Sequence, residues 1–216
     1  MSCVALKERE NISRKKIALE QMGVKQCLIV GRFHVWFPNG YTDSMIRIAP
    51  YTTYDRGVKL YFYNITQNTD LIVDVQSDGY YSFLCNGTDK YLFKSFRYTK
   101  NLGSTYTCIS GEINIEINSV PFATVYLGHS MFIFSSHKKD LNAQKLKTDW
   151  NRIAAFQYVR NNFISNDSPT WLKYNLVENR FDVEENYTGE VTFFVFPPPE
   201  PNPFPIDQFH LFGHPK

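Results

Sequence analysis

The sequence predicts a β-dominated α+β fold: an antiparallel β-sandwich with a projecting N-terminal helix and a long helix near the C-terminus. Three observations lead to this fold class. Many short segments alternate apolar and polar residues, turn-forming residues separate most of them, and two longer stretches without proline or glycine have helical spacing. Hydrophobic residues make up 43% of the 216-residue chain, which suffices for one domain with a substantial core.

The first predicted element is a helix over residues 4–22, which Gly23 would end. Its apolar stripe is narrow and includes Leu6, Ile12 and Leu19, while charged side chains cover most of the remaining surface. A helix of this kind buries little against its own domain. It is therefore either a lightly docked surface helix or an arm, residues 1–24, that packs on a neighbouring molecule.

The sandwich domain is predicted over residues 25–196 and begins with a strand at 26–37. Asn39 and Gly40 form a strong hairpin signal, because both tolerate a positive φ, and a second strand returns over 41–49. The clearest alternation is "EINIEIN", where three isoleucines point one way and the Glu and Asn side chains the other. Strand candidates lie at 58–66, 71–76, 80–85, 90–98, 105–110, 112–118, 122–127, 131–136, 170–176 and 190–196.

Near the C-terminus the pattern changes to a predicted helix over residues 140–164. Asp140 or Asn142 is the expected N-cap, because a short polar side chain can accept from the first free backbone N–H groups. One face of this helix would hold the apolar residues Leu146, Trp150, Ile153, Ala154 and Phe163. The predicted order is therefore helix, many strands, one long helix and two final strands.

Composition argues against several classes of function. A net charge of +2 is too balanced for nucleic-acid binding, which needs a basic face, and no apolar run has the length of a membrane span. The N-terminal residues are charged rather than typical of a secretory signal, so we expect the chain to stay inside the cell. The four cysteines occur singly, and we expect buried free thiols at Cys3, Cys27, Cys85 and Cys108.

No motif in the sequence supports catalysis. Nucleotide-binding glycine loops, zincin motifs and nucleophile elbows are absent from the sequence, and its five histidines lack metal-ligand spacing. We expect the pair His129 and Ser130 in a loop that follows the strand at 122–127, and Asp74 to Gly79 in a hairpin turn. We therefore predict that the protein is no enzyme and has no catalytic residue, metal or cofactor.

Tyrosines gather in one part of the chain, within 31 residues. They are Tyr51, Tyr54, Tyr61, Tyr63, Tyr80 and Tyr81. Three interpretations stay open: ordinary strand and interface packing, a ligand-stacking face as in a sugar-binding module, and a cluster that titrates in alkali. With unperturbed Tyr and Lys pKa values, the net charge would fall from +2 to about −12 near pH 10.4. A dense assembly of such chains would then repel itself.

Residues 197–216 form a segment rich in proline and phenylalanine. A proline-rich segment is usually a solvated linker, but this one also carries apolar side chains that include Phe204, Phe209, Leu211 and Phe212. Proline lowers the entropy cost of fixing an extended segment, and the aromatic residues give it something to bury. We predict that it is a contact tail for another copy of the same protein.

Short motifs at both ends of the chain resemble those of polyhedrins, the occlusion-body proteins of insect viruses. One is the basic "SRKK" at Ser13–Lys16, within the first predicted helix. The other is the acidic "DVEEN" at 182–186, followed by the strand "EVTFFVF" and a late "LFG" at Leu211–Gly213, which is similar to the end of baculovirus polyhedrins. The initial order of helix, strand, turn and strand is similar to cypovirus polyhedrins.

The resemblance implies a structural function. Polyhedrins self-assemble into an intracellular crystalline lattice, the viral occlusion body, in the cytoplasm of the infected host cell. This lattice embeds and protects virus particles and dissolves at alkaline pH. The partners would be further copies of the chain and virus particles, with no nucleic acid and no membrane.

Other classes of function remain open at this point. A β-sandwich carbohydrate-binding module of the lectin type would explain the tyrosines, although not the first helix or the tail. A pore-forming protein would also place a helix before a β-sandwich, but the narrow apolar stripe of 4–22 argues against membrane insertion. An unrelated capsid or other structural protein is a further possibility.

Overall fold

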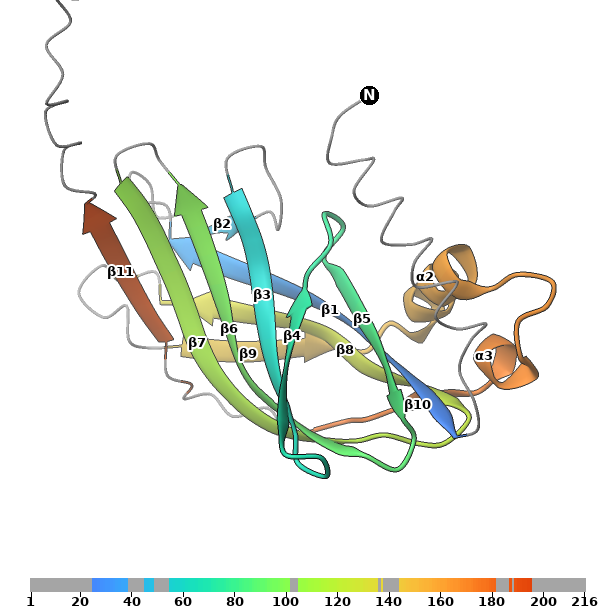
Figure 1. The fold of residues 1–216 in the computed structure, drawn as a ribbon. Coiled ribbons are helices and arrows are strands. Elements are labelled where there is room, and N and C mark those ends of the chain that lie inside the picture. Colours follow the sequence, from blue (N-terminus) through green and yellow to red (C-terminus); the bar gives the residue numbers. More distant parts are fainter. Residues whose placement is uncertain are drawn as a thin grey trace, which may run out of the picture.

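Over the residues that it describes, the computed structural model consists of two packed β-sheets and two short helices (Figure 1). The structure describes residues 25–38, 45–48, 55–101, 105–135, 137, 144–181, 187 and 189–195. The predicted helix at 4–22 and the whole of 1–24, with Leu6, Ile12 and Leu19, lie outside these residues, as does the tail at 197–216 with Phe204, Phe209, Leu211 and Phe212. Tyr51, Tyr54 and the predicted turn at Asn39 and Gly40 lie outside them too.

One sheet is built around two long parallel strands, β1 (Gln26–Pro38) and β8 (Ala123–Phe134). The free side of β1 pairs with two antiparallel strands in succession, β5 (Tyr80–Asn86) and β2 (Met45–Ile48). The free side of β8 pairs with the parallel strand β10 (Leu176–Glu178) and the antiparallel strand β9 (Gln144–Asp149). We call it the mixed sheet, and its parallel pairs correct the prediction that the sandwich is wholly antiparallel.

The second sheet is antiparallel throughout, as predicted. Its strands run in the order β11 (Gly189–Val195), β7 (Thr105–Asn118), β6 (Lys90–Asn101), β3 (Asp55–Asn64) and β4 (Thr69–Asp74). Strand β7 joins two segments that the sequence predicts as separate strands. The isoleucines of "EINIEIN" face the core as predicted, since all three are buried and the Glu and Asn residues between them are exposed.

The core lies between the two sheets and is strongly aromatic. Phe33 of β1 lies 5.1 Å from Phe96 and 6.0 Å from Phe93 on β6, measured between ring centroids. Phe132 of β8 lies 4.7 Å from Phe96, and Phe62 stacks on Phe93 at 4.6 Å. Each fully buried side chain of this size stabilises the fold by roughly 1.5–3 kcal/mol, so the contacts of Phe33 and Phe132 with the β6 rings account for much of the attraction between the sheets, while Phe62 and Phe93 stack within one sheet.

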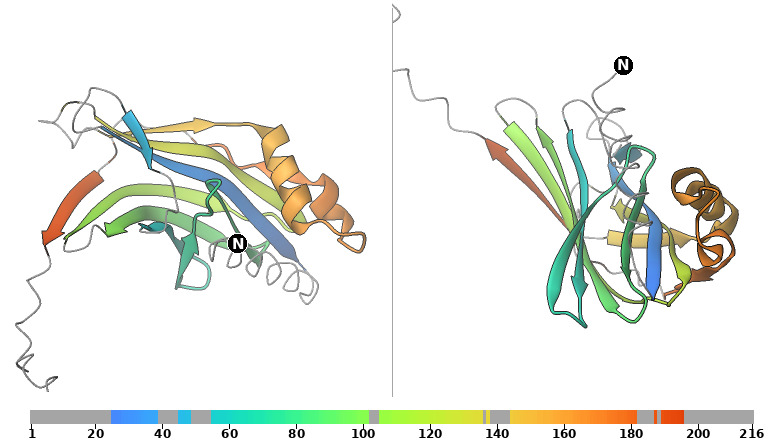
Figure 2. Two further views of the ribbon diagram at one scale, coloured as in Figure 1. Left: turned by 90° about the horizontal axis from the view of Figure 1, so that it is seen from above. Right: turned by 45° about the vertical axis from the view of Figure 1, so that its right-hand side comes forward.

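Helices α2 (Arg152–Phe163) and α3 (Thr170–Tyr174) cover the outer face of the mixed sheet (Figure 2). Tyr158, Val159 and Phe163 of α2 and Leu172 of α3 pack on Leu28 and Val30, while Ala155 packs with Tyr126 and Leu176. None of the described elements covers the outer face of the antiparallel sheet in this way (Figure 2). Of the helices that the structure describes, none is long and apolar enough to span a membrane.

The predicted helix over 140–164 is wrong in its first half. Residues 144–149 form β9, where Gln144 and Leu146 are buried while Lys145 and Lys147 are exposed, an alternation of period two. The helix begins at Arg152, because the side chain of Asn151 accepts a hydrogen bond of 3.0 Å from the backbone N–H of Ala154. It is a 12-residue helix rather than a long one.

Two other predictions are corrected. Residues 170–176 do not form one strand, because α3 occupies 170–174 and β10 begins at Leu176. The turn before Tyr80 exists, with the N–H of Gly79 donating to the Gln76 carbonyl at 2.9 Å. However, it is not a hairpin, since it connects β4 of the antiparallel sheet to β5 of the mixed sheet.

Candidate functional site

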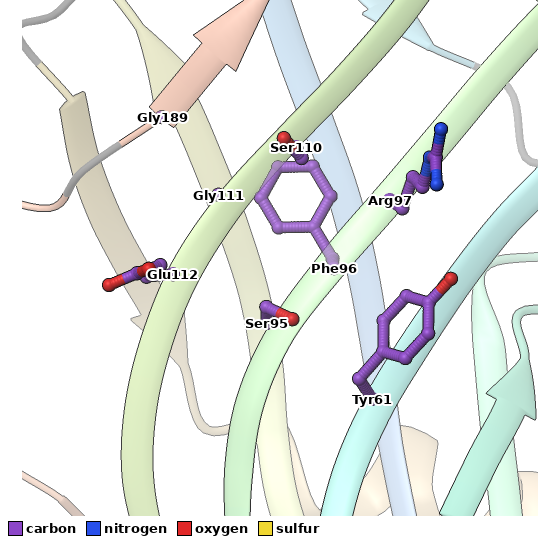
Figure 3. Close-up of a pocket in the computed structure, with 8 residues that line it drawn as sticks. All are labelled: Tyr61, Ser95, Phe96, Arg97, Ser110, Gly111, Glu112 and Gly189. Atoms are coloured by element: carbon purple, nitrogen blue, oxygen red, sulfur yellow. The ribbon is translucent and has the colours of Figure 1, made fainter.

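A groove of about 400 Å³ lies on the outer face of the antiparallel sheet (Figure 3). It crosses four adjacent strands, and eight of the described residues line it. They are Tyr61 of β3, Ser95, Phe96 and Arg97 of β6, Ser110, Gly111 and Glu112 of β7, and Gly189 of β11. Sites for small molecules typically have volumes of about 300–1,000 Å³, so the groove has the size of a binding site.

The floor of the groove is formed by small residues on neighbouring strands. Gly111 pairs with Gly189 across β7 and β11 and with Phe96 across β6 and β7. A Cβ atom at Gly111 would lie 2.5 Å from the Phe132 ring and 2.6 Å from the Phe96 ring, so no larger residue fits. The missing Cβ lets the two sheets approach at this row, and the short side chains of Ser95 and Ser110 leave the space outside it open.

The walls of the groove carry complementary polar groups. The Tyr61 ring is half-buried on β3, and Arg97 and Glu112 are exposed on β6 and β7 (Figure 3). The Nε–H of Arg97 donates to the Cys108 Sγ at 3.0 Å. The groove therefore offers an aromatic face, a guanidinium donor, a carboxylate acceptor and hydroxyl groups that can do both.

Beside the groove, side chains on the same face of the sheet pair with one another. Lys94 forms an ion pair with Asp70 at 3.3 Å and lies 5.3 Å from the centre of the Tyr63 ring, while the Tyr63 hydroxyl donates to the Asn68 side chain. Lys59 and Asp74 form a further ion pair at 3.6 Å. Tyr63 thus has intramolecular partners, whereas the Tyr61 ring lines the groove.

Among the groove residues, the sequence predicts a functional role only for Tyr61. Ser95, Arg97, Ser110 and Glu112 have the pattern of ordinary outward positions on strands. The signal that could have found the groove is Gly111, which in the sequence resembles a break between two strands. It is instead a glycine within one long strand, which often marks a close approach of backbone to something else.

The six clustered tyrosines do not form one cluster in the structure, as far as it describes them. Tyr61 and Tyr63 lie on the antiparallel sheet, whereas Tyr80 and Tyr81 lie on β5 of the mixed sheet. The Tyr80 ring stacks on Tyr158 of α2 with centroids 4.2 Å apart, and Tyr81 is fully buried. The alkaline-titrating role of the cluster stays a prediction.

Burial changes how the tyrosines titrate. It raises the pKa of Tyr80, Tyr81 and Tyr91 above the usual value and raises the pKa of Tyr126 and Tyr158 to about 12. The cause is the same in all five: the low dielectric of the interior disfavours the phenolate. The folded chain therefore holds these phenols neutral at pH values where exposed tyrosines ionise.

A second polar cluster lies on the mixed sheet. His34 of β1 and His129 of β8 share a hydrogen bond, and burial lowers the pKa of His34 to about 3 and that of His129 to about 4. The structure corrects the expectation of a loop here, because His129 and Ser130 lie within β8. Ser130 shares a hydrogen bond of 3.4 Å with Thr148 instead of with a histidine, so this pair is no catalytic Ser-His arrangement.

The cysteine prediction is confirmed at three positions, where Cys27, Cys85 and Cys108 are free and buried. Cys27 lies opposite Cys85 across β1 and β5, and the Cys85 thiol donates to the Cys27 carbonyl oxygen at 3.6 Å. The neighbouring Cys27 side chain together with burial raises the pKa of Cys85. Cys3 lies outside the described residues. Within the described part of the chain, no group of three or more His, Cys, Asp or Glu side chains is placed to hold a metal ion.

Comparison of the chain with protein-family models, with curated proteins and with solved structures finds no match. The function of the chain is therefore inferred from its own residues and their arrangement in the fold.

Proposed function

We propose that this chain is a structural protein that self-assembles into an intracellular crystalline lattice of the occlusion-body type, which embeds and protects virus particles. One observation carries the proposal. Strand β11 lies at the edge of the antiparallel sheet (Figure 1), and in the sequence it is followed by the proline- and phenylalanine-rich segment 197–216. An edge strand offers unpaired backbone groups, so this side of the domain is suited to contacts between copies.

Two further features support contacts between copies. The opposite edge of the same sheet, at β4, presents Ile72 with 55% of its surface exposed, and the turn before it presents Ile65 at 42%. The motifs "SRKK" and "DVEEN" before "EVTFFVF" resemble polyhedrin motifs. In this proposal Leu6, Ile12, Leu19, Phe204, Phe209, Leu211 and Phe212 make the contacts between copies.

The buried tyrosines supply a physical route to alkaline dissolution. A phenol whose folded pKa exceeds its unfolded value of about 10 contributes stability that is complete below pH 10. That stability is lost as the pH rises from 10 toward the folded value, which is about 12 for Tyr126 and Tyr158. Strong alkali would therefore weaken each subunit while exposed tyrosines and lysines lose protons and repel neighbouring copies.

The test is expression of the full chain in insect cells. We expect refractile crystals inside the cells that dissolve above about pH 10. A chain that stays a soluble monomer at high concentration would remove the proposal.

Variants separate assembly from folding. Deleting residues 197–216, or replacing Phe204, Phe209, Leu211 and Phe212 together by Ser, is expected to abolish crystals and leave the circular dichroism spectrum unchanged. Ile153→Ser is the matched control, because Ile153 is an apolar residue on α2 with 72% of its surface exposed. If the deletion variant crystallises like the full chain, the tail makes no lattice contact.

A further inference from the structure

The groove on the antiparallel sheet has the fixed backbone frame that a ligand site needs. Its floor is the backbone at Gly111 and Gly189 with the short side chains of Ser95 and Ser110, and core packing keeps Gly111 a glycine, because a Cβ atom there would collide with the Phe96 and Phe132 rings on the inner side of the sheet. Its lining side chains stand on strands of one hydrogen-bonded sheet, which holds them more firmly than a loop would (Figure 3). Little backbone entropy is therefore left to be lost when a ligand binds.

The charges that the described lining residues bring to the groove favour a neutral ligand. Arg97 and Glu112 line the same groove from adjacent strands, so an anionic ligand would face the carboxylate and a cationic ligand would face the guanidinium. A polyhydroxylated molecule avoids both conflicts, because each hydroxyl can accept from Arg97 or donate to Glu112. Hydrogen bonds that involve a charged partner are also the stronger ones.

The Tyr61 ring suits the apolar part of a polyhydroxylated ligand. A sugar ring has a face of C–H groups and a rim of hydroxyls, so it is apolar in one direction and polar in the other. Tyr61 on β3 can cover the apolar face, while Ser95, Ser110, Arg97 and Glu112, on the two strands next to it, can meet the hydroxyl groups (Figure 3). The groove is open at the surface, which suits a segment of a longer chain.

We infer that the groove of Tyr61, Ser95, Arg97, Ser110 and Glu112 is a binding site for a neutral carbohydrate, with Tyr61 stacking on the sugar ring and Arg97 and Glu112 holding its hydroxyl groups. This inference is independent of lattice formation, since it concerns the face of a single copy. A chain that fails to crystallise could still bind, and a crystallising chain could fail to bind.

The experiment uses the labelled full chain, kept dilute at neutral pH, on an array of neutral and acidic glycans. The best neutral oligosaccharide is then titrated by calorimetry. We expect at least one neutral oligosaccharide to bind with a Kd tighter than about 1 mM. If no neutral glycan binds with a Kd tighter than about 1 mM, or if binding is confined to acidic glycans, the inference is overturned.

Variants place the binding in the groove. Tyr61→Ala and Arg97→Met are expected to weaken binding at least tenfold, and Tyr61→Phe is expected to keep most of it, because the ring remains. Tyr63→Ala is the matched control, since Tyr63 lies two residues along the same strand and outside the groove lining. Equal losses in Tyr61→Ala and Tyr63→Ala would overturn the inference.

A further variant tests the site by filling the groove while folding is monitored. Ser110→Phe adds a large side chain on the outer face, so it is expected to fill the groove and abolish binding without changing the circular dichroism spectrum or the unfolding temperature. Unchanged binding in Ser110→Phe contradicts the site.

Discussion

The Nδ1 atom of His34 lies 2.5 Å from the Nε2 atom of His129, so the two imidazoles share one hydrogen bond across the parallel strands β1 and β8. Only a pair with one donor and one acceptor nitrogen can do this, which two neutral rings provide. Burial is the main cause of the low pKa of both rings, and the nearby guanidinium groups of Arg32 and Arg47 lower it further. Asp149 acts in the opposite sense on His129.

The histidine pair is expected to make the fold sensitive to mild acid. In the unfolded chain both rings gain a proton near pH 6.5, whereas in the folded chain they resist protonation until about pH 4 for His129 and pH 3 for His34. Their contribution is therefore present above pH 6.5 and is lost as the pH falls toward those values. Allowing for solvent screening, the pair should lower the free energy of unfolding by about 1–2 kcal/mol at pH 5 relative to pH 7.

Urea unfolding of the wild-type chain at pH 7 and pH 5 measures this loss. In the double variant His34→Gln and His129→Gln, which keeps amide groups but cannot titrate, the drop between the two pH values should be smaller by that amount. An identical drop in both proteins would show that other groups cause the acid sensitivity.

Gly79→Ala is expected to be strongly destabilising. Gly79 has a φ of +88°, and a Cβ atom there would lie 2.5 Å from the Nε2 of His34. The backbone conformation alone costs an L-residue about 1 kcal/mol, and the buried imidazole, with only 2% of its surface exposed, has little room to move. We expect a loss of about 2–4 kcal/mol in chemical denaturation.

A double-mutant cycle separates the two causes. In the background of His34→Ala the collision is gone, so Gly79→Ala should cost only about 1 kcal/mol there. Equal costs in both backgrounds would mean that the backbone conformation alone explains the effect.

Tyr81→Phe is expected to leave stability at pH 7 unchanged or to raise it by about 1 kcal/mol. The Tyr81 hydroxyl is buried without a hydrogen-bond partner among the described residues, so its removal relieves a desolvation cost. The ring still packs against Phe62 at 6.0 Å between centroids. Burial raises the pKa of Tyr81, and each such phenol lowers the free energy of unfolding by about 1.4 kcal/mol per pH unit above pH 10. The free energy of unfolding of the variant should therefore fall less steeply with pH in this range.

Thermal unfolding at pH 7 and urea unfolding between pH 9 and 11 measure these two effects. Tyr63→Phe serves as the comparison, because Tyr63 is only half-buried. A clear destabilisation of Tyr81→Phe at pH 7 would show that the hydroxyl has a partner after all.

Asn64→Leu is expected to cost about 2–3 kcal/mol. The side-chain amide of Asn64 donates to the buried Asp89 carboxylate at 2.9 Å and to the Tyr91 hydroxyl at 3.1 Å. Leucine has a similar branched shape but no donor, so the buried carboxylate, in the turn between β5 and β6, would lose a partner. Gln67→Leu removes the second amide on Asp89, at 2.8 Å, from a more exposed position and should cost less. Equal losses by calorimetry would contradict this ranking.

Alternation of apolar and polar residues is sufficient to predict most of the strands, because a sheet with one buried face imposes a period of two. It fails where strand and helix patterns overlap. Leu146 and Trp150 are spaced as on a helix, yet Leu146 lies in β9 and Trp150 follows the strand, and the decisive signal is the Lys145 and Lys147 alternation. Asn151 is a residue type that often caps a helix, but it lies inside the apolar spacing that predicts one helix over 140–164, so the sequence does not mark it as the start of the helix.

The candidate sites are less predictable than the strands. The groove joins residues of four strands, and the His34 to His129 contact joins positions about one hundred residues apart, so no local spacing reveals them. The sequence does place Tyr61 among tyrosines with a possible stacking role. It cannot show that Tyr80 and Tyr81 belong to the other sheet, because the turn at Gly79 carries the chain from one sheet to the other.

The parallel pairing of β1 and β8 has a consequence for how the chain folds. Cys27 pairs with Ala123 and Trp36 with Ile133, so β1 cannot pair with β8 until about one hundred further residues have been synthesised. During synthesis, β1 leaves the ribosome long before β8, and its backbone edge is then unpaired and its apolar side chains are exposed. We expect the closing of this pair to be the slow step of folding, and the stage at which newly made chains are most exposed to mistaken pairing with one another.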